Sequence, residues 1–280
     1  MSGESRWQHF PLHTLEQLFD AIEVDDVVED QVSLPDSGAL LCADDEQVHQ
    51  CYSLCVQLWL DGVSRRALLA LVGALKQHGD LTHAERRRFK SIRAKFKHLR
   101  FAQRLFRKNH KGGGLLHCTT VTMGKLQDAL RGGHHAELQR NIRMMQQLLL
   151  PPVWALMRRN IIHQQLDSAA AICDYRQRCF QSLVPSIESL VLDGRRFHNT
   201  RKIVSQQVAY YDTFRTLYPD NEVATRMSRF TAAINGLMGD RHDDIIAATL
   251  RGERAYGDIE SLSEDVRWRL ERLVKALNRD

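Results

Sequence analysis

Residues that break helices are rare in this chain, and their rarity restricts the fold more than any other feature. Six prolines and sixteen glycines are spread over 280 residues. The long stretches between them are rich in Leu, Ala, Gln, Arg, Glu and Met, which give no local reason to leave a helix. The sequence therefore predicts an all-α protein, long enough to bury a sizeable core in one large domain or two smaller ones.

Hydrophobic periodicity and breaker residues divide the chain into a series of helices. The stretch Thr82-His83-Ala84-Glu85 has capping-box spacing and predicts the start of a long basic helix, which the three glycines at 112–114 end. The other helices are expected over residues 12–22, 46–60, 64–77, 119–131, 135–150, 153–188, 195–217, 222–250 and 260–278.

Charge is distributed unevenly along the chain. Residues 1–60 contain one basic residue, Arg6, against twelve acidic ones, a net charge of −11, so with a total of +5 the remainder carries +16. A basic body with an acidic N-terminal segment suggests a polyanionic partner, and an N-terminus that screens access to it. The alternative is that the two ends simply attract each other.

Nothing in the sequence marks the chain for export or for a bilayer. The start, MSGESRWQHF, lacks an apolar region, and apolar runs such as residues 67–75 are too short to span. We therefore expect a cytoplasmic protein without a membrane partner. The cysteines are then expected to be reduced thiols, and the spacing of Cys51, Cys55 and His49 is not that of a zinc site. The six cysteines are Cys42, Cys51, Cys55, Cys118, Cys173 and Cys179.

Eight cations recur at alternating spacings of four and three residues, and we call them the basic stripe: Arg86, Lys90, Arg93, Lys97, Arg100, Arg104, Arg107 and Lys111. On an α-helix this alternation keeps them within one arc of roughly 100° along about 37 Å of axis. No acidic residue lies between Arg86 and Gln127 to neutralise them. Like charges three or four residues apart destabilise a helix, so the pattern predicts a bound polyanion that compensates for them.

The apolar residues of the same helix form a second stripe about 100° from the first: Phe89, Ile92, Phe96, Leu99 and Phe106. The cations thus flank the buried seam, where side chains line a groove between packed helices. A solvated basic face is the alternative, but such a face is usually interspersed with Glu.

Two segments of the chain look alike, LQDALRGGHH at 126–135 and INGLMGDRHD at 234–243. Each follows a basic helix, and the second of these helices contains His198, Arg201 and Lys202. Residues from about 86 to 250 therefore read as two copies of one helical unit.

On these residues the chain resembles the conserved histidine α-helical domain (CHAD) family. In that family each half opens with a His-x-x-Arg helix and ends with a Leu-Gln-x-x-Leu-Gly…Asp signature. His198-x-x-Arg201 keeps the first pattern, whereas Lys97 stands at the histidine position of the first half. Gly239 and Asp243 keep the second signature, where the first copy has Arg131 and His135. Two positions that tend to be cationic in the family's second half are Ser205 and Val208.

The resemblance covers residues 86–280, with halves of about 86–190 and 191–280, and leaves 1–85 as an unassigned acidic helical segment. It implies two pseudo-repeated helical bundles with a basic groove between them, which binds inorganic polyphosphate. Arg and Lys suit phosphate chains, because a guanidinium can hold two phosphate oxygens. The expected polyanion-binding residues are Lys90, Arg93, Lys97, Arg100, Arg104, Arg107, Lys111, Arg195, His198, Arg201 and Lys202.

Two other functions compete with this interpretation. The doublet His242-Asp243 is typical of metal-dependent phosphohydrolases, but converging ligands are matched only by count, in His134, His135, His163 and His198. A nucleic-acid-binding protein would use the same cations, yet no usual module is present and little aromatic surface remains for base stacking. We therefore expect a non-enzymatic binder without cofactor or metal.

Overall fold

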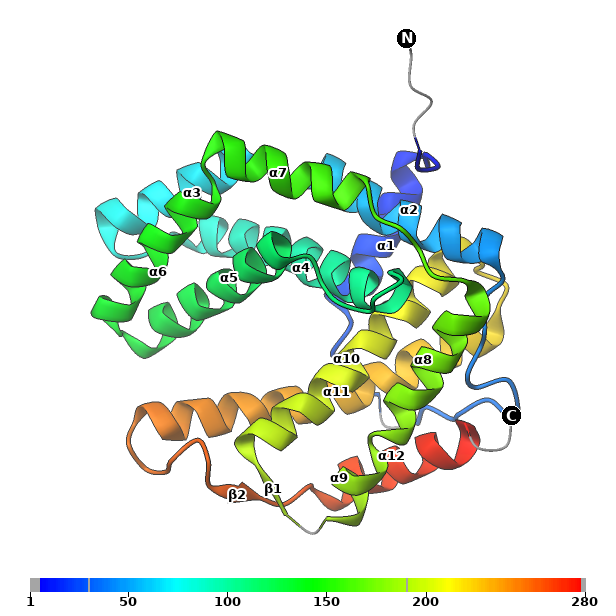
Figure 1. The fold of residues 1–280 in the computed structure, drawn as a ribbon. Coiled ribbons are helices and arrows are strands. Elements are labelled where there is room, and N and C mark those ends of the chain that lie inside the picture. The colour runs from blue at the N-terminus through cyan, green and yellow to red at the C-terminus, as the bar shows by residue number, and fades with distance from the viewer. Residues whose placement is uncertain (1–5, 30, 190, 278–280) are drawn as a thin grey trace. The chain divides into compact units, whose positions relative to one another are not determined.

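In a computed structural model of the chain, residues 6–29, 31–189 and 191–277 are described. Helices account for most of these residues, and one pair of two-residue strands is the only sheet among them, so the all-α prediction is confirmed (Figure 1). The chain forms two compact units. The first combines residues up to Leu15 with Tyr52–Leu166, and the second combines Glu16–Cys51 with the chain from Asp167 onward.

Two of the unit boundaries fall within the first two helices, α1 (Leu12–Glu23) and α2 (Asp45–Gly62), and the third lies between Leu166 and Asp167. Residues 1–85, expected as one acidic segment, are therefore divided between the two units. The repeat halves at 86–190 and 191–280 stay a prediction.

The first unit continues with five helices: α3 (Arg65–His78), α4 (His83–Phe106), α5 (Gly114–Gly132), α6 (His135–Leu148) and α7 (Pro151–Ile162). The capping box at the start of α4 is formed as predicted, with Glu85 N–H donating to Thr82 Oγ1 and Thr82 N–H donating to Glu85. Gly133, in the left-handed region at φ +68°, ends α5 and lets α6 fold back beside it (Figure 1).

Aromatic side chains close the core of the first unit around α4. Phe96 packs edge-on against Trp59 with ring centroids 5.5 Å apart, and Trp59 stacks on Trp154 at 5.3 Å. These contacts fix α4 against α2 and α7, and so they hold the backbone that carries the basic stripe.

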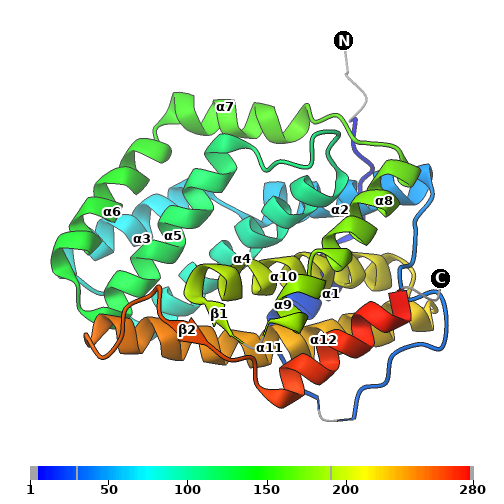
Figure 2. The same ribbon diagram turned by 60° about the horizontal axis from the view of Figure 1, so that its bottom comes forward.

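The second unit contains five helices and two strands: α8 (Ala169–Gln181), α9 (Val184–Glu188), β1 (Leu192–Asp193), α10 (Gly194–Leu217), α11 (Glu222–Leu250), β2 (Ile259–Glu260) and α12 (Glu264–Leu277). The long helices α10 and α11 lie side by side, and β1 pairs antiparallel with β2 (Figure 2). At the start of α10, a Cβ on Gly194 would lie 2.3 Å from the Tyr256 carbonyl oxygen, so the close approach of these backbones requires glycine.

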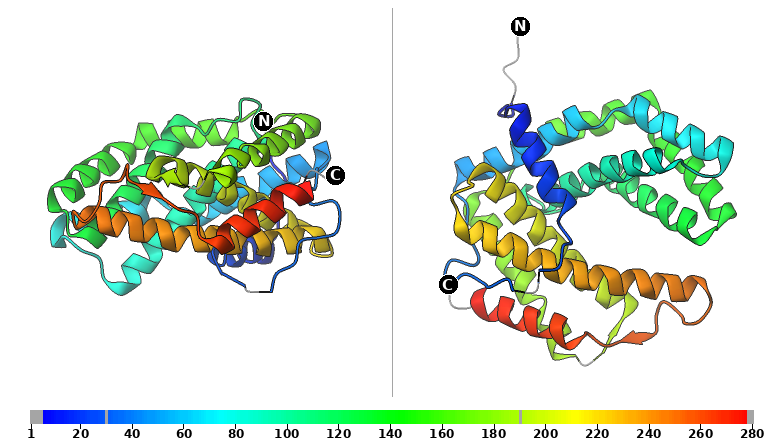
Figure 3. Two further views of the ribbon diagram at one scale, coloured as in Figure 1. Left: turned by 90° about the horizontal axis from the view of Figure 1, so that it is seen from below. Right: turned by 180° about the vertical axis from the view of Figure 1, so that it is seen from behind.

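The segment that follows α1 runs along α11 in the second unit (Figure 3). Asn235 donates a hydrogen bond of 2.8 Å from Nδ2 to the Asp25 carbonyl. A Cβ on Gly236 would lie 2.1 Å from the Asp26 carbonyl oxygen, so this glycine lets the segment touch the helix. Buried polar atoms thus tie an acidic, loop-forming stretch to the core.

The predicted single helix over 153–188 is wrong, because the chain leaves the helical conformation after Ile162. Residues just beyond that point pair with the segment after α4. Lys108 N–H donates to the Gln165 carbonyl at 3.2 Å, and the backbones of Arg107 and Leu166 form an isolated β-bridge. Helix formation resumes at Ser168, whose hydroxyl caps the N–H of Ala171. This long-range pairing overrides local helix propensity.

The prediction that all six cysteines are reduced thiols is wrong for two of them. Cys42 and Cys173, 131 residues apart in sequence, form a disulfide with a Cα–Cα distance of 5.3 Å. The buried Arg176, one helical turn further along α8, donates from Nη1 to the Leu40 and Leu41 carbonyls at 2.6 and 2.7 Å. Disulfide and guanidinium together fix residues 40–42 to α8. The cytoplasmic location stays a prediction.

Candidate functional site

The basic stripe begins with a cation that is neutralised. Arg86 donates to both carboxylate oxygens of Asp80 at 2.5 and 2.6 Å. The backbone N–H of Leu81 and the hydrogen bonds from Arg86 lower the pKa of Asp80. Both side chains are about half exposed. Arg86 is therefore held at the start of α4 and contributes little to a ligand site. Lys90, the next cation, is exposed.

Further along α4, two cations of the stripe interrupt an otherwise buried surface. From His98 to Phe106 every residue is buried apart from Arg100 and Arg104. Arg100 is partly buried and Arg104 is exposed. The core therefore covers the remaining faces of the helix, and this half of α4 is open only along the basic stripe.

Arg100 lies in an unfavourable electrostatic environment. Burial lowers the pKa of its guanidinium to about 10, and repulsion from Arg104 and Arg93 adds to the effect. The group therefore stays protonated at neutral pH. Within the described part of the chain, neither Arg100 nor Arg104 forms an ion pair with a carboxylate. Arg100 instead makes a cation–π contact with the Phe101 ring, whose centroid lies 5.1 Å from the guanidinium carbon.

The middle of the stripe lies close to α5. A Cβ on Gly124 would come within 3.2 Å of Arg93 Nη2, so this glycine leaves room for the guanidinium against α5. Lys97 Nζ lies 6.0 Å from the centroid of the Phe101 ring. Arg93, Lys97, Arg100 and Arg104 thus share one face of one helix, as predicted.

The last two cations of the stripe do not belong to the helix, which corrects the prediction of a helix up to Lys111. Arg107 has extended dihedral angles (φ −78°, ψ 145°) and is the C-terminal cap of α4. The backbone of Arg107 forms an isolated antiparallel β-bridge with Leu166, and its side-chain Nη1 donates to the Lys111 carbonyl at 2.9 Å. The backbone pairing and the low helix propensity of the glycines draw the chain into a loop, with Lys111 exposed.

The second unit gathers its candidate residues between α10 and α11. The imidazole rings of His198 and His242 stack with centroids 4.8 Å apart, and Tyr256 packs edge-on against His242 at 6.4 Å. Arg201 extends over Gly239, where a Cβ would come within 2.8 Å of its Nη2. The sequence pattern linked His198 to Arg201, but it did not show that His242 stacks on His198.

The other two predicted residues flank this second cluster. Arg195 is exposed near Tyr256, whose pKa is raised by burial and by Asp193, while Arg195 acts in the opposite direction. Lys202 is half-buried next to Arg201. The stripe belongs to the first compact unit and this cluster belongs to the second, so their use in a common groove stays a prediction.

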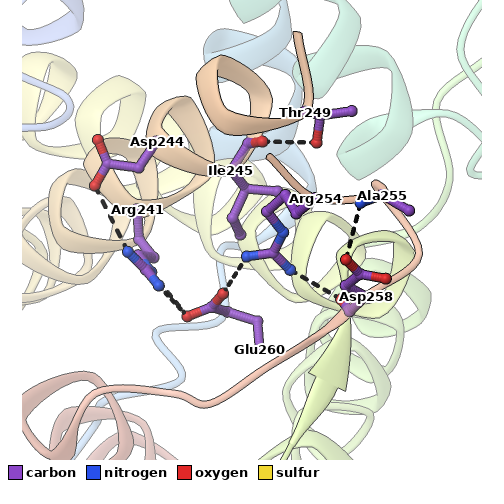
Figure 4. Close-up of polar contacts among 8 residues, drawn as sticks. All are labelled: Arg241, Asp244, Ile245, Thr249, Arg254, Ala255, Asp258 and Glu260. Atoms are coloured by element: carbon purple, nitrogen blue, oxygen red, sulfur yellow. Dashed lines mark hydrogen bonds and ion pairs between the residues drawn. The ribbon is translucent and has the colours of Figure 1, made fainter. Parts of the chain in front are cut away.

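Charged residues near the His242-Asp243 doublet hold the loop between α11 and β2 in the second unit (Figure 4). Glu260 is 8 % exposed and accepts hydrogen bonds from Arg241 at 2.8 and 2.5 Å and from Arg254 at 2.6 Å. Burial would raise its pKa, but the two guanidinium groups outweigh burial and lower it. Asp258 accepts from Ala255 N–H in the same loop. Sequence reasoning missed this cluster, because its members are unremarkable charged residues until the loop folds back.

The doublet itself has little of the geometry of a metal site. His242 Nδ1 lies 3.9 Å from Asp243 Oδ1, and Asp244 lies 3.8 Å from Arg241. In the part of the chain that the structure describes, no three His, Cys, Asp or Glu side chains converge as metal ligands would. The absence of a metal and of catalysis stays a prediction.

A scan of family models, a search of curated proteins and a search of solved structures found no match to the chain. The resemblance to the CHAD family therefore stays a proposal. Among the described helices, none combines the length and apolar character that crossing a bilayer requires.

Proposed function

We propose that this protein binds a polyanion without chemical turnover, and that the polyanion is inorganic polyphosphate. The observation that carries the proposal is the environment of Arg100. Arg100 is partly buried and lies between two other cations of the same helix, Arg93 and Arg104. In the described part of the chain it forms no ion pair with a carboxylate. Retaining such a group is unfavourable for the free protein, because burial and repulsion both act against it. A bound polyanion would offset both.

Polyphosphate fits this arrangement better than nucleic acid does. Arg100 and Arg104 can each hold phosphate oxygens through two N–H groups, which needs no base recognition. The aromatic residues of α4 are buried, with Phe101 at 3 % exposure and Phe89, Phe96 and Phe106 at 1 % or less. Few aromatic faces on this helix are therefore left for stacking with bases, on which single-stranded nucleic-acid binders depend.

The experiment that tests the proposal is a titration of the protein with long-chain polyphosphate, duplex DNA and single-stranded RNA at matched phosphate concentration. We expect tight binding of polyphosphate and a steep salt dependence. For five to eight phosphate contacts, the slope of log K against log salt should be about −3.5 to −5.6, since each contact contributes roughly −0.7 on a flexible strand. A slope near zero would refute polyanion binding, and preference for DNA or RNA would favour a nucleic-acid-binding protein instead.

The proposal of a binder without catalysis has its own test. Purified protein with added divalent metal ions should release no phosphate from polyphosphate or nucleotides. Turnover that depends on the metal and is lost in His242→Ala would favour a phosphohydrolase of the His-Asp type.

A further inference from the structure

A cavity of about 760 Å³ opens within the first unit, where the loop after α4 faces the end of α7. One part of its lining comes from the loop between Arg107 and Gly114, and the other from the segment between Arg159 and Gln165. Its volume lies within the range of roughly 300–1,000 Å³ that is typical of pockets for small ligands.

The lining of this cavity is strongly and uniformly basic. It contains four cations, Arg107, Lys108, Lys111 and Arg159, together with His163, and it contains no Asp or Glu. None of the four cations forms an ion pair with a described carboxylate. A concave site lined by charges of one sign concentrates the field and attracts ions of the opposite sign.

The start of α5 adds backbone donors to the same wall. Gly113 is the N-cap of α5, and no side chain caps this helix end. The Gly113 N–H is itself used, since it donates to Gln103 Oε1 at 2.7 Å. Gly114, which also lines the cavity, is exposed, and a Cβ there would have no neighbour within 4 Å, so there is free space beside its Cα. The N–H groups of the first turn and the positive end of the helix dipole favour an anion here.

The C-terminal end of α7 opposes this effect less than a bare helix end would, because three of its last four carbonyl groups accept hydrogen bonds. The Asn160 carbonyl accepts from the Gln164 side chain, and the Ile162 carbonyl accepts from Trp7 Nε1 at 2.8 Å. The Arg159 carbonyl accepts from His163 N–H at 3.0 Å. The negative end of this helix is therefore capped by donors, while the Arg159 side chain lines the cavity.

The two walls are held together before any ligand arrives. Between the walls, Lys108 N–H donates to the Gln165 carbonyl, and the backbones of Arg107 and Leu166 form an isolated β-bridge. Within one wall, Arg107 Nη1 donates to the Lys111 carbonyl. A site whose backbone is fixed in advance loses less conformational entropy when it binds.

We infer that this cavity binds a short condensed phosphate of the size of pyrophosphate or tripolyphosphate. Four cations and the N-terminus of α5 around one cavity match a compact ion that carries several negative charges on many acceptor oxygens. The inference goes beyond the proposed function, since a short ion needs neither a long chain nor Arg100 and Arg104. It shares Arg107 and Lys111 with the basic stripe.

Calorimetric titration of the full-length protein with pyrophosphate and tripolyphosphate tests this inference, with matched variants on α7. Arg159→Ala should weaken binding at least tenfold, because it removes a cation from the wall. Arg158→Ala, the exposed neighbour outside the lining, should change affinity less than about twofold. Equal losses in the two variants, or no binding by the wild type, would overturn the inference.

Two further ligands identify the chemistry. Citrate, a compact trivalent carboxylate, should bind at least tenfold more weakly than tripolyphosphate; equal binding would mean a general anion site and would overturn the inference. ATP that binds as well as tripolyphosphate would support the phosphate pocket and show that its source includes the phosphate tail of a nucleotide.

A spectroscopic readout needs no variant. Pyrophosphate should shift the amide NMR signals of Gly113 and Gly114 while distant glycines such as Gly73 stay unchanged, and the absence of such shifts would overturn the inference. Failure of this inference can be distinguished from failure of the proposed function. If Arg100→Glu with Arg104→Glu leaves long-chain binding unchanged while pyrophosphate still depends on Arg159, only the stripe proposal fails.

Discussion

Replacing Arg100 with methionine should stabilise the free protein while weakening its affinity for polyanions. A fall of the guanidinium pKa to about 10 corresponds to roughly 3 kcal/mol of lost preference for the charged form in the folded state. Solvent screening reduces this value, and loss of the contact with the Phe101 ring removes about 0.5–1 kcal/mol. Methionine keeps much of the side-chain volume, so we expect a net gain of roughly 1–2 kcal/mol.

The assay is thermal unfolding at low and high salt, with and without long-chain polyphosphate. At low salt the Arg100→Met midpoint should rise by roughly 2–8 °C, and added salt should narrow the gap by screening the repulsion in the wild type. Polyphosphate should raise the wild-type midpoint more than that of the variant. The exposed control Arg87→Met should change stability by less than about 0.5 kcal/mol.

A lower midpoint for Arg100→Met than for the wild type at low salt would refute this reasoning. It would mean that Arg100 is a structural cation, whose contacts in the folded protein outweigh its burial and repulsion.

Three further predictions concern the second unit. Burial raises the pKa of the Asp212 carboxyl to about 6, so the folded state holds this proton more tightly than the unfolded state does. The free energy of unfolding should therefore fall by up to about 3 kcal/mol as the pH rises from about 4 to 6, and Asp212→Asn should remove that part of the pH dependence in urea unfolding. A peptide map without reductant should contain a peptide that links Cys42 to Cys173, and Cys42→Ser should lower the unfolding midpoint; alkylation of both cysteines before reduction would contradict the disulfide. His198→Ala and Arg201→Ala should each weaken polyphosphate binding severalfold at fixed salt, and unchanged affinity in both would limit the site to the basic stripe.

Local sequence signals predict most of the helices. Thr82 and Glu85 give the start of α4, because a capping box acts over three residues and needs no tertiary partner. Hydrophobic periodicity likewise predicts a helix over residues 222–250, which agrees with α11. Where local chemistry decides, the prediction holds to within a few residues.

Tertiary contacts decide the places where the prediction fails. Arg107 leaves the helix because it bridges Leu166, a partner 59 residues further along the chain. Cys42 and Cys173 meet across 131 residues, and no spacing rule pairs them in a chain of six cysteines. The sequence pattern alone predicted that cations line one face of α4 beside its buried seam, but it did not show how closely Arg100 is packed or that a cavity lies beside Arg159.

The affinity of two matched double variants for long-chain polyphosphate tests the central claim most directly. Arg100→Glu with Arg104→Glu changes the net charge by the same amount as Arg87→Glu with Arg88→Glu, and Arg87 and Arg88 are exposed on other faces of α4. At one fixed salt concentration, with helicity checked by circular dichroism, the first pair should lose roughly a hundredfold or more in affinity, because each change removes a charge-assisted contact and adds repulsion. The second pair should lose less than about fivefold. Equal losses from the two pairs would show that net charge alone governs binding, and would contradict a site built on the basic stripe.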